Sequence, residues 1–137
     1  MNSRRLLRTS YWVGAIADFV NAIAMVSPPL MARMLNLDQV PTSVDARLAL
    51  LMGASLMFGW TALLIWADRK PFERRGVLLI TIFPVILGLA LTTLYGFLKG
   101  YIPIEGAIPI WLLQIFLTVL FLSAYLCAQK DKDGSSP

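Results

Sequence analysis

Asp18 and Asn21 are the residues whose types and spacing suit chemistry, because both interrupt an apolar run long enough to cross a membrane. An acid near the middle of a membrane span costs about 2.5–3.5 kcal/mol on insertion scales. On a helix Gly14, Asp18 and Asn21 share one face, so we expect this face to point into the protein. The pair suits a proton, cation or ligand-orienting site, or alternatively hydrogen bonding between helices.

Three hydrogen-bond donors are expected at the depth of Asp18. This residue lies about seven residues, or roughly 10 Å, from the N-terminal end of its span. The same depth on the second and third apolar segments falls at Trp60, Thr61 and Thr81. The predicted intramembrane polar site therefore joins these three donors to Asp18 and Asn21.

A second group is charged and lies in or beside the connections at the opposite ends of the spans. Such residues can line a polar vestibule, although most exposed charges are simply solvated. Arg47 falls in the first turns of the second span, where pairing with Asp45 or Glu105 is expected. The predicted outer cluster consists of Arg33, Asp45, Arg47 and Glu105.

Several chemistries are excluded by composition. The chain has no histidine and its one cysteine is Cys127, so it cannot supply a haem-ligating His, a zinc site or an intramolecular disulfide. The sequence shows neither a glycine-rich phosphate loop nor a nucleophile elbow. We therefore predict no catalytic residue, cofactor or metal, and an enzyme is disfavoured.

The elements that must position these residues are membrane-spanning helices. With 58% hydrophobic residues and a mean hydropathy of +0.70, the chain is too apolar for a water-soluble domain of 137 residues. Basic residues fall in short clusters between apolar runs, which favours a lipid bilayer over nucleic acid as the partner. We predict one all-α domain over residues 1–137, a bundle of four transmembrane helices at about 10–27, 43–67, 75–98 and 106–129.

Prolines and polar residues mark the ends of these spans. Ser27 with Pro28 and Pro29 predicts a break followed by a short interfacial helix over about 28–35. Thr42 and Asp45 resemble a capping box at the start of the second span. Pro84 predicts a kink in the third span. Small residues predict close helix packing, at Gly53, Gly59, Gly88 and Gly96.

Basic residues predict the orientation, because they accumulate in cytoplasmic loops. Only Arg33, Arg47 and Lys99 fall on one side of the predicted spans. The other nine predict that both termini are cytoplasmic, and they are Arg4, Arg5, Arg8, Arg69, Lys70, Arg74, Arg75, Lys130 and Lys132.

Three short sequence features follow one another along the chain. They are Pro28-Pro29, then Asp45-Ala46-Arg47 before Gly53, then the basic turn with Arg69-Lys70-Pro71 and Arg74-Arg75. This order resembles the small DoxX-like four-helix bacterial membrane proteins. The resemblance implies a compact four-helix bundle in the bacterial inner membrane, with no known reaction. Asp18 and Asn21 match no site of that family.

Two functions follow from these features. The first is a non-enzymatic membrane module that binds a lipid, a hydrophobic solute or a partner protein, as a homo-oligomer or as a subunit beside a membrane partner. The alternative is a small oligomeric transporter or channel that uses Asp18 and Asn21 as its intramembrane polar site.

Overall fold

The computed structural model describes residues 3–133, and within that range all regular structure is helical. Four helical segments are long and apolar enough to cross a membrane, and a short helix follows the first. The predicted all-α fold with four such helices is confirmed to this extent. The elements are α1 (Ser3–Val26), α2 (Pro28–Met34), α3 (Val44–Asp68), α4 (Gly76–Ile80), η1 (Thr81–Ile86), α5 (Leu87–Leu98) and α6 (Ile104–Asp133).

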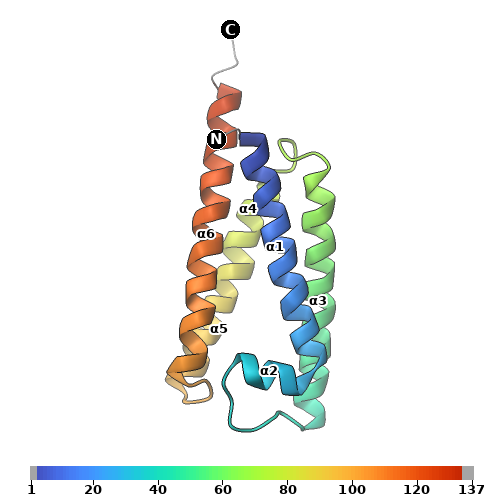
Figure 1. Ribbon diagram of the computed structural model, residues 1–137, viewed down its shortest axis with the longest axis vertical. Coiled ribbons are helices and arrows are strands. Elements are labelled where there is room, and N and C mark those ends of the chain that lie inside the picture. Colours follow the sequence, from blue (N-terminus) through green and yellow to red (C-terminus); the bar gives the residue numbers. More distant parts are fainter. Residues whose placement is uncertain (1–2, 134–137) are drawn as a thin grey trace.

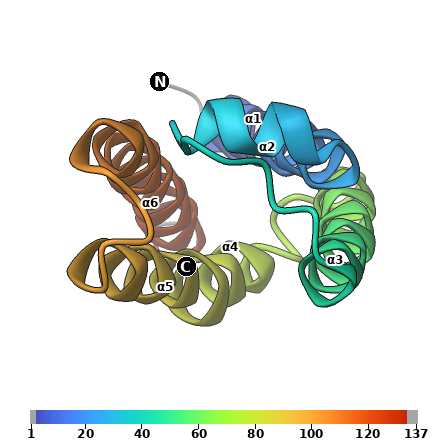
Figure 2. The same cartoon turned by 90° about the horizontal axis from the view of Figure 1, so that it is seen from below.

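The long segments run up and down, with α4, η1 and α5 forming one continuous third segment (Figure 1). α1 packs against both α3 and α6, and the third segment packs against α6 (Figure 2). α1 starts and α6 ends at the same end of the bundle, here called the termini end. The opposite end, here called the α2 end, holds α2 and the turn between α5 and α6 (Figure 1).

The helices are longer than the apolar runs that predicted them. α1 begins at Ser3 rather than near residue 10, because Leu6 and Leu7 are buried and extend the packed face beyond the apolar run. α6 likewise extends beyond the predicted span at both ends. Hydropathy measures the length that suits lipid, whereas a helix continues wherever its neighbours pack against it.

The start of α3 corrects one residue of the predicted cap. The N-cap is Ser43, whose hydroxyl accepts a hydrogen bond from the Ala46 amide at 3.2 Å, and the helix begins at Val44. Ser43 is one residue after the predicted Thr42. Either residue type suits the position, so a capping pattern alone did not decide between them.

α2 and α5 end in the same way, at the same end of the bundle. Asn36 (φ 51°) and Gly100 (φ 72°) adopt the left-handed conformation two residues after each helix ends, directly after its C-cap. The Leu37 amide donates to the Ala32 carbonyl at 2.8 Å, and the Tyr101 amide donates to the Gly96 carbonyl at 2.8 Å. This pattern is the Schellman motif, which uses Gly or Asn as the left-handed residue. Two sharp turns therefore stand at the α2 end.

The third segment changes its helical pitch around Pro84. Residues Thr81–Ile86 form a π-helical turn that contains this proline. A proline cannot donate a backbone hydrogen bond, and a π turn is one way in which a helix accommodates the lost bond. The predicted local disturbance at Pro84 therefore takes the form of a wider helical turn.

The apolar core occupies the half of the bundle near the termini. On α1, α3 and α6, the large buried apolar side chains are Leu6, Leu7, Tyr11, Leu64, Leu117 and Phe121. All of them lie on the termini side of Asp18, Trp60 and Gln114 on their respective helices. On the α2 side of these levels, the buried residues of the three helices are small, namely Ala22, Ala24, Ala54, Gly106 and Ala107.

Candidate functional site

The contact between α1 and α6 is fixed by a glycine beneath an aromatic ring. A Cβ added to Gly14 would come within 2.7 Å of Phe121 Cζ, so a larger residue at this position would force the ring to move. Phe121 is fully buried. This contact sets which faces of the two antiparallel helices meet.

Asp18 and Gln114 lie on those meeting faces. Asp18 follows Gly14 by one helical turn, and Gln114 precedes Phe121 by two turns, so each shares a face with its partner in the contact. The step from Gly14 forward to Asp18 on α1 and the step from Phe121 back to Gln114 on α6 both lead toward the α2 end, because the two helices are antiparallel (Figure 1). The two polar residues therefore lie within about one helical turn of each other along the bundle axis.

Both residues carry a buried oxygen atom without a hydrogen-bond donor. Among the residues that the structure describes, Asp18 Oδ2 and Gln114 Oε1 are the buried side-chain polar atoms that have no partner. Gln114 is only 8% exposed. Since buried polar atoms are nearly always satisfied, two unsatisfied acceptors on facing helices need an explanation.

The predicted donors to Asp18 donate elsewhere, which corrects the expected polar site. The Trp60 indole donates to Thr81 Oγ1 at 3.1 Å and so links α3 to the third segment. Thr61 donates to the Met57 carbonyl, and Thr81 donates to the Val77 carbonyl. A threonine in a helix often bonds the carbonyl four residues earlier, which uses its only hydroxyl hydrogen. Asn21 is half-buried one turn beyond Asp18.

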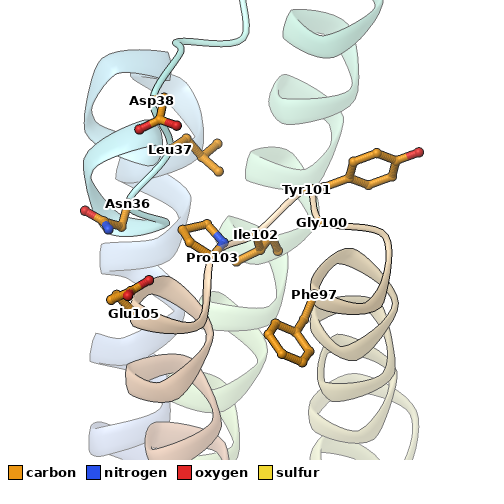
Figure 3. A pocket seen from close by; sticks show the side chains of 9 residues that line it. All are labelled: Asn36, Leu37, Asp38, Phe97, Gly100, Tyr101, Ile102, Pro103 and Glu105. Atoms are coloured by element: carbon orange, nitrogen blue, oxygen red, sulfur yellow. The ribbon is translucent and has the colours of Figure 1, made fainter.

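A pocket of about 540 Å³ lies at the α2 end, between the segment after α2 and the turn that joins α5 to α6. Leu37 and Phe97 extend into the space between these segments from opposite sides, whereas the Tyr101 ring points away (Figure 3). Asp38 and Glu105 supply carboxylates to the lining. The two Schellman turns described above shape this pocket. Its lining is part apolar and part acidic.

The predicted outer cluster lies at this end but does not assemble. Arg33, Asp45, Arg47 and Glu105 are all exposed. Ion pairs join Arg8 with Asp68 and Lys70 with Glu73, and among the described residues Arg47 pairs with neither Asp45 nor Glu105. Long exposed side chains gain little from pairing in water. Of the four, Glu105 alone lines the pocket.

A polar cluster at the termini end was missed by the sequence reasoning. Asp68, on α3, accepts two hydrogen bonds from the Arg8 guanidinium at 3.0 and 3.1 Å and one from the Trp12 indole at 3.2 Å. The Arg74 guanidinium stacks on the Trp66 ring and donates to the Trp66 carbonyl. The sequence did carry a signal for this cluster, because Asp68 is an acid at the end of an apolar run that is otherwise followed by basic residues.

The predicted packing glycines separate into two groups. A Cβ on Gly53 or Gly96 would come within 3 Å of the end of a neighbouring side chain, Met25 or Ile102 respectively. A Cβ on Gly59 or Gly88 would meet no atom within 4 Å, so neither marks a close helix contact within the chain. The tightest approach is at Gly106, where a Cβ would overlap the Leu35 backbone carbonyl.

Four helices that are long and apolar enough to cross a membrane indicate a multi-pass membrane protein. Comparisons with protein-family models, curated proteins and solved structures give no match. The resemblance to DoxX-like proteins therefore stays a prediction, and no relative supplies an activity. Among the described residues no three of the His, Cys, Asp and Glu side chains are grouped to hold a metal ion.

Proposed function

We propose that this protein is a non-enzymatic membrane module that binds a lipid or another hydrophobic solute. The pocket at the α2 end carries this proposal. Its volume of about 540 Å³ falls in the usual range for small-molecule sites. Leu37 and Phe97 offer apolar contact, while Asp38 and Glu105 offer hydrogen-bond acceptors, which is the combination that an amphiphile requires.

The interior of the bundle supports the same proposal. In the α2 half of α1, α3 and α6, the buried side chains are small, whereas the large ones lie in the other half. The larger side chains of these helices in that half are at most half-buried, and the half-buried ones are Met25, Leu50, Met57, Ile110 and Trp111. We infer that an acyl chain or a compact apolar solute suits this less tightly closed half better than a water-soluble substrate does.

Photocrosslinking in nanodiscs tests the pocket directly. A phospholipid carrying a diazirine near its headgroup should label peptides that contain Phe97 or Leu37 above the level of the general lipid-facing surface. Ile102→Trp fills the pocket and should suppress this labelling. Leu112→Trp is the matched control, because Leu112 is 63% exposed on the outside of α6. Uniform labelling along all four helices, unchanged by Ile102→Trp, contradicts the proposal.

A small oligomeric transporter or channel is the second candidate, and the unpartnered Asp18 oxygen favours it. Intramembrane acids commonly mark ion or substrate paths. In reconstituted liposomes, Asp18→Asn would then fold normally but lose transport. Equal flux through the wild type and this variant contradicts a transport role for Asp18.

We further propose a bacterial inner-membrane location with the termini end in the cytoplasm, from the excess of basic residues at that end. A homo-oligomer or a membrane partner subunit is part of the proposal. Gly59 and Gly88 support it, because neither is used for close packing within the chain.

A further inference from the structure

We propose that Asp18 and Gln114 form a binding site for the ammonium group of a small amphiphilic amine, in the interior of the bundle between α1 and α6. This inference rests on the proposed function of a module that binds amphiphilic solutes, and it adds a second site with its own class of ligand. The site is distinct from the pocket at the α2 end. Gln114 lies nine residues beyond Glu105 on α6, or about 14 Å along the helix.

The chemistry of the two free atoms defines the ligand. Asp18 Oδ2 and Gln114 Oε1 are both acceptors, and both are buried without a partner. A ligand that satisfies them must supply at least two N–H or O–H groups. An ammonium group supplies three donors, which is more than the two that these oxygens require.

The charge of the Asp18 carboxylate restricts the chemical class of the ligand further. Asp18 is the only charged residue within the apolar segments 9–26, 48–67, 76–98 and 106–129. A carboxylate in such surroundings lacks a cationic side chain, so a bound cation would stabilise its ionised form. A neutral alcohol would satisfy the hydrogen bonds but would leave the charge uncompensated.

The surroundings accommodate the rest of such a ligand. On the termini side of the site, Leu117 and Phe121 close the interior with large side chains. On the α2 side, the buried residues of α1 and α6 are small, namely Ala22, Ala24, Gly106 and Ala107. The larger side chains of these helices on that side are at most half-buried, so we expect the apolar part of the amine to extend toward the α2 end.

The alternative is that Asp18 and Gln114 only stabilise the fold. The two readings differ in what removal of an acceptor does to stability. If Gln114 were structural, Gln114→Leu would lower the unfolding midpoint. If Gln114 instead serves to bind a ligand, Gln114→Leu removes an unsatisfied buried acceptor. The unfolding midpoint of the ligand-free protein then stays unchanged or rises.

Calorimetric titration in nanodiscs, with empty nanodiscs subtracted, tests the site. The probes are n-hexylamine, n-hexanol and sodium hexanoate, which share one chain length and differ in the polar group. The wild type should bind hexylamine at least about tenfold more tightly than the other two. Asp18→Asn and Gln114→Leu should each weaken hexylamine binding, whereas Gln129→Leu, at an exposed position of α6, should not.

The outcomes separate the inference from the function on which it rests. If hexylamine binds no better than hexanol, or if Gln114→Leu lowers the unfolding midpoint and leaves hexylamine binding intact, the ammonium site is overturned. Lipid crosslinking at the α2 pocket would then still uphold the proposed function. If that crosslinking also fails, both are wrong. Should Asp18→Asn not fold, Gln114→Leu alone decides the outcome.

Discussion

Asp68 accepts three side-chain hydrogen bonds from two residues of α1. Its carboxylate joins Arg8 and Trp12 of α1 to the end of α3, and its side chain is only 10% exposed. Bonds to an ionised acceptor are among the stronger hydrogen bonds in proteins, and a planar guanidinium adds geometric specificity. We infer that this contact fixes how α1 and α3 meet at the termini end.

Asp68→Ala should therefore lower the thermal unfolding midpoint in detergent by a few degrees. It removes three hydrogen bonds between two helices and leaves the Trp12 indole without its acceptor. Glu73→Ala is the matched control, because the Lys70–Glu73 pair lies within one turn and both side chains are more than half exposed. Equal midpoints for the two variants would show that the Asp68 contacts add nothing to stability.

At the scale of single residues, the sequence predicted the depth of a polar side chain along the bundle better than it predicted the hydrogen-bond partner of that side chain. Trp60 and Thr81 do meet, as their common depth required, but they bond each other. Counting residues along a helix gives the depth of a residue along the bundle axis. The acceptor of a threonine hydroxyl hydrogen depends instead on the nearest backbone carbonyl. Gln114 carried a signal, as the one amide between Gly106 and Ala128, yet its burial followed only from the Gly14–Phe121 contact.

Among the elements, the segment after α2 is held most closely by the start of α6. Gly106 lies against the Leu35 backbone with no room for a Cβ, and the neighbouring Ala107 is fully buried. A flexible side chain can move aside, but a backbone carbonyl within a Schellman turn cannot move without disturbing its hydrogen bonds. This contact therefore determines where the pocket segment lies.

Gly106→Ala should destabilise the protein by about 1–3 kcal/mol, the usual cost of adding a carbon atom to a closely packed site. It should also weaken lipid crosslinking at the pocket, because the displaced segment carries Leu37 and Asp38. Gly76→Ala provides the control, since a Cβ there meets no atom within 4 Å, the position is exposed, and alanine favours a helix. Unchanged stability and crosslinking in Gly106→Ala would refute this account of the α2 end.

The sequence predicted the number and order of the elements, because apolar runs and prolines are local signals. Pro28 and Pro29 placed α2 correctly, and Ser43 caps α3 one residue from the expected position. The glycine contacts were less predictable. Gly88 and Gly106 look alike along the chain, and only the tertiary arrangement puts a backbone carbonyl beside one and open space beside the other.

For the whole molecule, the two ends of the bundle differ in charge. Nine of the 12 Lys and Arg residues fall in the segments at the termini end, and the turn between α3 and α4 lies at that end as well. The pocket at the α2 end has acidic residues and no basic residue in its lining. An orientation with the termini end inside would therefore open the pocket toward the outer face of the membrane.

Cysteine accessibility in intact bacterial cells measures this orientation. In a Cys127→Ala background, Asp38→Cys places a thiol at the α2 end and Glu73→Cys places one in the turn at the termini end, both at exposed positions. A membrane-impermeant maleimide should label Asp38→Cys in intact cells and should label Glu73→Cys only after the membrane is permeabilised. Neither change removes a Lys or Arg, so the basic residues that set the orientation remain. The reverse labelling pattern would place the pocket in the cytoplasm and limit its ligands to molecules that arise inside the cell.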